Sequence, residues 1–169
     1  MGEHMRSNQK GVTLVEIILV IAIIGIMAGT SVMMLGHLHY ADTQKVIKTI
    51  DSSLDKLQMQ SMSKAGDHYL YIYHLSGGCY MKILPDDLSS FDSSKLDSNG
   101  TKLANDTVSI YMDSASGTKV DGNDFIKVAY TKSLTFDTAK TNVSAIVVSG
   151  GSNYTIQLIT DTGKHFISN

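Results

Sequence analysis

Hydrophobic and polar positions divide the chain into three stretches with different repeats. The first is a run from Ile17 to Gly36 that carries no charge. About 20 apolar residues are enough to cross a bilayer as a helix. Gly25 and Gly29 are compatible with such a helix, because glycine is more frequent in membrane helices than in soluble ones. This stretch is therefore predicted to be a helix that is apolar on all sides.

The second stretch has a helical repeat. Its apolar positions form one stripe: Val46, Ile47, Ile50, Leu54, Leu57 and Met62. Its polar positions lie opposite: Lys45, Lys48, Ser52, Asp55 and Lys56. No proline interrupts residues 13–65, so we expect one helix of about 80 Å, at about 1.5 Å per residue. It should end near Lys64-Ala65-Gly66, where glycine suits a left-handed cap. Residues 12–36 would span the membrane and residues 37–66 would pack on a globular domain.

Beyond Gly66 the repeat changes to two, which predicts strands. Tyr69, Tyr71 and Tyr73 alternate with apolar neighbours, and a turn at residues 76–78 leads to a returning strand at residues 79–84. The tyrosine row is interpreted as a packed sheet face rather than a ligand platform. Residues 86–106 are rich in Ser, Asp, Asn and Lys and are predicted to be a long surface connection.

Further strands are expected nearer the C-terminus: Val108–Met112, Phe125–Thr131, Val143–Ser149, Tyr154–Thr160 and His165–Ser168. Hairpin turns are expected at residues 150–153 and 161–164. A long helix followed by antiparallel strands is an α+β arrangement. The helical stripe should be buried against one sheet face of a C-terminal domain at residues 67–169.

Glu16 lies inside the apolar segment, where a charge needs a partner. At the bilayer centre a charged side chain costs roughly 2.5–3.5 kcal/mol on insertion scales. Thr13 and Glu16 match an S/T-x-x-E capping box, which supplies a local role. Alternatively, a cut between Gly11 and Val12 would create an α-amine that can pair with the carboxylate of a neighbouring helix. The two roles can apply at different stages.

Composition and charge limit the classes of protein that fit. The length allows one modest domain with an appendage, and a net charge of −2 offers no basic surface for nucleic acid. Arg6 and Lys10 outweigh Glu3 before the apolar run, which keeps the N-terminus cytoplasmic and places the residues after Gly36 outside. Cys79 is the only cysteine, so no internal disulfide is expected and the residue is interpreted as buried.

The N-terminal segment resembles the class III signal of type IV pilins and pseudopilins. The likeness rests on the basic leader at residues 1–11, the motif Gly11-Val12-Thr13-Leu14-Val15-Glu16 and the apolar helix that follows. It implies that a prepilin peptidase cuts after Gly11 and N-methylates Val12. It also implies that Glu16 meets the Val12 amine of an adjacent subunit during filament assembly. The family usually has Phe where this chain has Val12.

The same resemblance implies partners and a location. The partners would be the prepilin peptidase, other pilin or pseudopilin subunits, an inner-membrane assembly platform and the lipid bilayer. The protein would be a single-pass membrane protein before assembly, and part of a surface pilus or an envelope pseudopilus afterwards. The closing strand–GG–strand–TGK–strand pattern resembles H-type minor pseudopilins, and the missing disulfide favours a Gram-positive system or a pseudopilin. Adhesion or motility, DNA uptake and secretion are the systems that such subunits serve.

No pattern indicates catalysis, a metal or a cofactor. His37 and His39 are expected to be polar residues at the membrane exit. His74 and His165 lie on different strands with no nearby acid, and no cysteine pattern of zinc spacing is present. Residues 121–124, Asp-Gly-Asn-Asp, lack the twelve-residue calcium spacing and are interpreted as a hairpin turn. Without a nucleophile–base pair or a phosphate loop, an enzyme is not expected.

Three functions of different classes fit these observations. The favoured one is a structural, pilin-like subunit. The second is a single-pass membrane protein whose extracellular β-sheet domain binds or senses something. The third is a secreted β protein whose apolar run is removed by ordinary signal peptidase near Ala28-Gly29. Glu16 favours the first, because a plain anchor gains nothing from a buried acid, whereas a filament can use it for register.

Overall fold

The computed structural model divides the chain into two compact units, residues 1–36 and residues 37–169. It describes residues 13–63 and 66–169, apart from the side chains of residues 30–38. Within that part, helix α1 (Leu14–Ser63) precedes eight strands whose pairings are all antiparallel. The α+β class is confirmed.

Helix α1 begins and ends close to the predicted residues. Thr13 precedes its first residue, and Ser63 is its last. Lys64 and Ala65, where the helix end was expected, lie outside the described residues. Gly66 has a φ of +90°, which is the left-handed conformation that glycine supplies just beyond a helix.

The predicted apolar stripe of α1 is confirmed within residues 37–169, with one exception. Val46, Ile50, Leu54 and Leu57 are fully buried, and Ile47 is nearly so. The polar positions named with the stripe are exposed.

The prediction that Met62 belongs to the buried stripe is wrong. Its side chain is 63% exposed, and Ser61 is buried instead. Ser61 lies four residues after Leu57 and therefore on the same side of the helix, whereas Met62 is turned away from it. The Ser61 hydroxyl donates to the Leu57 carbonyl at 3.0 Å, so its burial leaves no unpaired polar group.

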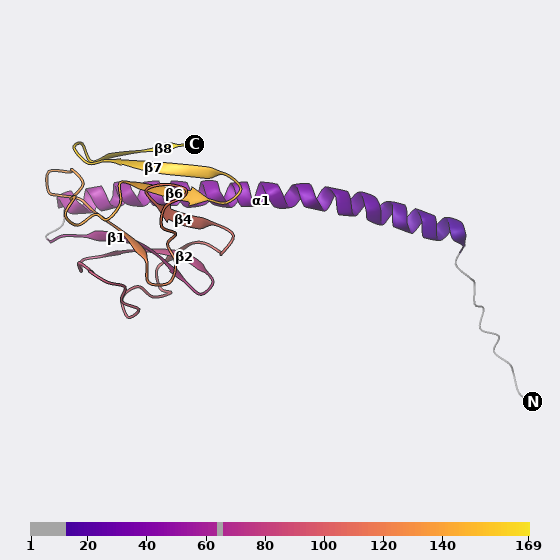
Figure 1. Ribbon diagram of the computed structural model, residues 1–169, viewed down its shortest axis with the longest axis horizontal. Helices are drawn as coiled ribbons and strands as arrows, with labels where there is room; N and C mark the ends of the chain where they lie inside the picture. Colours follow the sequence, from indigo (N-terminus) through magenta and orange to yellow (C-terminus); the bar gives the residue numbers. More distant parts are fainter. Residues whose placement is uncertain (1–12, 64–65) are drawn as a thin grey trace, which may run out of the picture. The chain divides into compact units, whose positions relative to one another are not determined.

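The strands form two four-stranded sheets rather than one. The first sheet has the order β3-β2-β1-β5, and the second has the order β4-β6-β7-β8. Their bounds are β1 Tyr69–Leu75, β2 Gly78–Leu84, β3 Thr101–Ala104, β4 Ser109–Met112, β5 Phe125–Ala129, β6 Ala145–Ser149, β7 Asn153–Ile159 and β8 Lys164–Ser168. Figure 1 shows β7 and β8 as the hairpin that closes the chain.

One hydrophobic core joins the helix to both sheets, so the expectation of burial against one sheet face is wrong. Ile50 and Leu54 of α1 share this core with Ile72 of the first sheet and Ile146 and Ile156 of the second. With β strands on two sides, the stripe is covered more completely than a single sheet could cover it. This explains why its central residues are fully buried.

The predicted surface connection at residues 86–106 contains a strand. β3 pairs with β2 at the edge of the first sheet, where Thr101 faces Met81 and Lys102 faces Tyr80. Thr101 and Lys102 are exposed. An edge strand of this kind buries little apolar surface, so it carries no clear alternation in the sequence.

The remainder of that connection covers the outer face of the first sheet. Tyr69, Tyr71 and Tyr73 form a second core there with Leu88 and Leu96 of the connection. The tyrosine row is therefore a packed sheet face, as predicted.

Hydrogen bonds attach the connection to this face. The Tyr71 hydroxyl donates to the Asp86 carbonyl and accepts from the Leu88 N–H, both at 2.8 Å. The Tyr73 hydroxyl donates to the Asp97 carbonyl at 2.7 Å. The first sheet is thus covered on both faces by its own chain.

Candidate assembly surface on the N-terminal part of α1

Thr13 caps the start of α1. Its hydroxyl oxygen accepts from the Glu16 N–H at 3.3 Å, and its carbonyl accepts from the Glu16 and Ile17 N–H groups at 3.0 and 3.2 Å. The bonds to the Glu16 N–H satisfy a group that a helix start leaves unpaired, and the bond from the Ile17 N–H is the first regular bond of the helix. The bond from the Glu16 N–H to the Thr13 hydroxyl is the hydroxyl half of the predicted capping box. The Glu16 side chain itself is exposed, which leaves its carboxylate accessible to a group from outside the chain.

The helix that follows exposes apolar side chains all around. The large hydrophobic residues from Leu14 to Met27 are each 48–75% exposed. Soluble monomers rarely expose continuous apolar surface on this scale, and such surface marks contact with another protein or with lipid. Glu16 is the only charged residue between residues 13 and 29. Glu16 therefore places one accessible carboxylate beside an otherwise uncharged surface.

In the described part of the chain, no helix has a stretch long and apolar enough to span a membrane. Gly11 and Val12, the predicted cleavage site, lie outside the described residues, as does the Val12 methylation site. Those assignments remain predictions from the sequence.

Comparison with protein families identifies the signal that the N-terminal segment carries. Residues 6–32 match the prokaryotic N-terminal methylation motif. The chain carries a class III prepilin signal. This signal is consistent with the type IV pilin and pseudopilin family, and it implies processing by prepilin peptidase and assembly with other pilin subunits. Neither the curated proteins nor the solved structures provide a match.

Beyond the prepilin signal, the structure corrects the interpretation of His165. Its side chain is only 8% exposed, and its Nε2 lies 3.4 Å from Asp51 Oδ1 and 3.5 Å from Asp55 Oδ1. Its Nδ1 lies 3.3 Å from the Tyr130 hydroxyl. The expectation that no acid is nearby is therefore wrong. The two aspartates come from α1, more than a hundred residues earlier in the sequence, so local spacing could not reveal them.

His74 is likewise flanked by acids. Its Nε2 lies 3.0 Å from Asp106 Oδ1, and its Nδ1 lies 3.3 Å from Asp121 Oδ1. Each carboxylate contacts a different nitrogen of the ring. One ring nitrogen and both carboxylates therefore cannot bind the same metal ion. Among the described residues, no group of three or more His, Cys, Asp or Glu side chains is arranged to hold a metal ion. His39 is exposed, and the His37 side chain lies outside the described set.

Residues 121–124 form a turn, as predicted, but not a hairpin. The Gly122 N–H donates to Asp121 Oδ1 at 2.8 Å, and the Asp124 N–H donates to the Asp121 carbonyl at 3.0 Å. The strand that follows, β5, pairs with β1 of the first sheet. The preceding Lys119 instead bridges to Tyr111 of β4 in the second sheet. The turn therefore leads from one sheet to the other.

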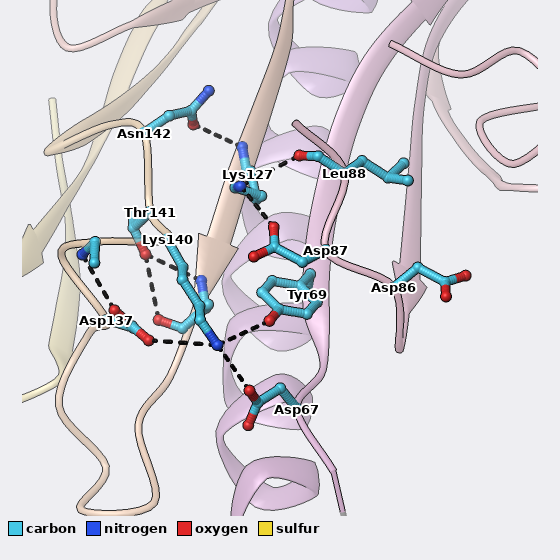
Figure 2. Close-up of polar contacts among 12 residues, drawn as sticks. Asp67, Tyr69, Asp86, Asp87, Leu88, Lys127, Asp137, Lys140, Thr141 and Asn142 are labelled. Atoms are coloured by element: carbon cyan, nitrogen blue, oxygen red, sulfur yellow. Dashed lines mark hydrogen bonds and ion pairs between the residues drawn. The ribbon is translucent and has the colours of Figure 1, made fainter. Parts of the chain in front are cut away.

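Two lysines, which the sequence did not single out, hold surface segments onto the first sheet (Figure 2). Lys140 Nζ lies 2.7 Å from Asp67 Oδ2 and 3.0 Å from the Tyr69 hydroxyl. Lys127 Nζ lies 2.8 Å from Asp87 Oδ1. The hydrogen bond from Lys140 lowers the pKa of Asp67 and, reciprocally, raises the pKa of Lys140. These pairs fix loops in place.

Proposed function

We propose that this chain is a minor structural subunit of a type IV pilus or related pseudopilus. The prepilin peptidase cuts it after Gly11, and Val12 is N-methylated. One observation supports this most directly. The helix that follows the prepilin signal is capped by Thr13 and exposes apolar side chains on all sides, beside a single accessible carboxylate. A filament core is built from apolar helices of this kind.

In this proposal Glu16 pairs with the Val12 amine of an adjacent subunit. Each charge alone is expensive in an apolar environment, and the pair compensates both. A helix cannot easily bring its own terminus to a side chain one turn away, whereas a neighbour shifted along the axis can. The Thr13 cap does not compete, because it engages the backbone N–H of Glu16 and leaves the carboxylate accessible.

Before assembly, residues 12–36 would hold the precursor in the bilayer, with the leader cytoplasmic and residues 37–169 outside. The assembly platform would then draw subunits from the membrane into the filament. The antiparallel β6-β7-β8 ending is compatible with the minor, H-type likeness, and so is Val12 in place of Phe. The role is structural rather than catalytic.

Processing tests this proposal. In the producing cell, the mass of the mature N-terminus should correspond to a chain that begins at methylated Val12. Gly11→Val should leave a membrane-bound, full-length precursor that is missing from sheared filaments, because the peptidase subsite has little room for a side chain. Gly25→Val is the matched control: a Cβ there meets nothing within 4 Å, so cleavage should be normal.

Other N-termini would replace the proposal with another function. Normal maturation of Gly11→Val contradicts the prepilin cleavage. A chain that keeps Met1 supports the alternative of a single-pass membrane protein with an extracellular β-sheet binding or sensing domain. A chain that starts near Thr30 supports ordinary secretion.

A further inference from the structure

A polar cavity lies between the buried part of α1 and the first sheet. Its volume is about 420 Å³, which is within the usual range for small-molecule sites. Ser53, Lys56 and Gln60 of α1 line one side. They are three and four residues apart, so they share one face of the helix. The cavity is thus built by elements that the core already fixes in place.

Cationic side chains line this cavity, and no carboxylate of a described residue does. That is unusual for a chain with 16 acidic and 14 basic residues. One lysine of the lining, Lys82, is already paired with Asp97 at 2.8 Å. The other, Lys56, is exposed and takes part in no ion pair between described residues. Its positive charge is available to a ligand.

His68 lies on the wall of this cavity, so its ring can report on what the cavity holds. It is part of the lining, and its Nδ1 is buried without a hydrogen-bond partner among the described residues. Buried polar atoms almost always have a partner in folded proteins. An imidazole nitrogen that carries a proton donates one directed hydrogen bond. Because His68 Nδ1 has almost no accessible surface, a ligand oxygen would reach it only if the wall around the ring rearranged.

The opposite wall is held in place before any ligand arrives. At Gly100 a Cβ would lie 2.4 Å from the Tyr73 hydroxyl and 3.0 Å from the Met81 carbonyl, so this segment lies directly on the first sheet. Asn99 Nδ2 donates to Asp97 Oδ2 at 2.7 Å, which fixes the orientation of that amide. A preformed wall lowers the ordering cost of binding.

We propose that this cavity binds the carboxylate or phosphate group of a small polar molecule. Lys56 supplies the charge, and the Gln60 amide, on the same face of the helix, can donate a hydrogen bond beside it. Charge-assisted hydrogen bonds of this kind are about twice as strong as neutral ones. Among its described lining residues the cavity has no Phe, Tyr or Trp to stack on a neutral sugar, which makes the anionic group the recognised feature. This site does not depend on filament assembly.

Titration of the full-length protein tests the site. The protein is labelled with ¹³C and ¹⁵N at histidine, held in a non-ionic detergent, and titrated at constant pH and ionic strength. The probes are sodium phosphate, glucuronate and glucose. The His68 ring resonances, assigned with His68→Asn, should shift saturably with phosphate, glucuronate or both, and not with glucose. A response to both indicates recognition of the anion alone, and a response to glucuronate alone indicates that the sugar ring contributes.

Two outcomes overturn the proposal. One is the absence of a saturable His68 shift with either anion, and the other is an equal response to glucose. Lys56→Gln should weaken binding by about tenfold, because one charge-assisted contact is lost. Lys48→Gln removes another exposed lysine of α1 and should leave affinity unchanged. Equal weakening by both variants would mean general attraction to the surface rather than binding in this cavity.

Discussion

The two parts of α1 contain similar apolar residues and differ in what covers them. From Leu14 to Met27 the large hydrophobic side chains are 48–75% exposed, whereas Val46, Ile50, Leu54 and Leu57 are fully buried. The buried part has a polar side and finds its cover in two sheets of its own chain. The exposed part has no polar side. Helices gain most of their stability from packing, so the exposed part depends on a partner outside the chain, either lipid or other subunits.

The most stringent test of this difference in burial is to place the same charge in each part of α1. Ile50→Asp puts an unpaired carboxylate into the core and should lower the free energy of unfolding of residues 37–169 by about 4 kcal/mol or more. Ile24→Asp is the matched variant at a side chain that is 58% exposed. It should leave that unfolding unchanged. Denaturant unfolding of the full chain in detergent, followed by tyrosine circular dichroism, measures both.

The two variants, Ile50→Asp and Ile24→Asp, can also be compared by a second measurement. Ile24→Asp should reduce recovery in the membrane and filament fractions, because the partner of that surface is apolar. An unchanged midpoint for Ile50→Asp, or equal destabilisation by both variants, would contradict the division of α1 into a part covered by its own chain and a part covered from outside.

The next largest effect is expected at Glu16. Glu16→Gln keeps the size and the backbone cap but removes the charge, so under the proposed pairing the Val12 amine of a neighbour would lose its partner. Loss of one partner of a buried pair typically costs about 3–5 kcal/mol. Helicity and membrane insertion should be preserved, and the ratio of filament to membrane protein on immunoblots should fall strongly. If Glu16→Gln assembles like the wild type while Glu16→Ala does not, the carboxylate serves only in capping.

A smaller loss of stability is expected at another surface that the chain covers itself, the outer face of the first sheet. Tyr71→Phe leaves the Asp86 carbonyl and the Leu88 N–H without their partner, which should cost about 1–3 kcal/mol of unfolding free energy. Tyr40→Phe is the control, because this tyrosine is 43% exposed and its hydroxyl bonds Gln44 and Tyr154, which still bond each other without it. Equal midpoints for the two variants would show that the phenol does not hold the connection.

The same hydroxyl predicts alkaline sensitivity. Burial raises the pKa of Tyr71 to about 12, from 10.0. Its contribution to stability is therefore full below pH 10 and is lost as the pH rises toward 12, because the unfolded chain releases the proton first. Tyr71→Phe should show a shallower loss of thermal stability over this range than the wild type.

Much of the fold could be predicted because its elements have clear apolar repeats. The hairpin of β1 and β2 was recognisable from alternating residues. Residues 150–152 and 160–163 separate β6, β7 and β8, each within one residue of the turns predicted at 150–153 and 161–164. The stripe through Ile50 and Leu54 was equally clear, because the spacing of apolar residues in an amphipathic helix indicates which side is buried.

The missed features depend on contacts between distant residues. β3 has a single buried residue, Leu103, so its sequence shows no alternation of apolar and polar residues. The division into two sheets follows from which strands pair, and strands of similar composition do not specify this. The acids around His165 come from α1, and the unpartnered Nδ1 of His68 depends on what the fold leaves around it. The prepilin motif was recognisable because it is a short linear signal.

Cys79 gives the folded domain chemical durability in an oxidising environment. It is a free cysteine that is 1% exposed, and burial raises the pKa of its thiol to about 11. At pH 7 only about one thiol in ten thousand is then the reactive thiolate. The buried thiol is thus protected from oxidation and from cross-linking one copy of the chain to another. The rate at which a thiol reagent modifies it would report directly how often the domain opens.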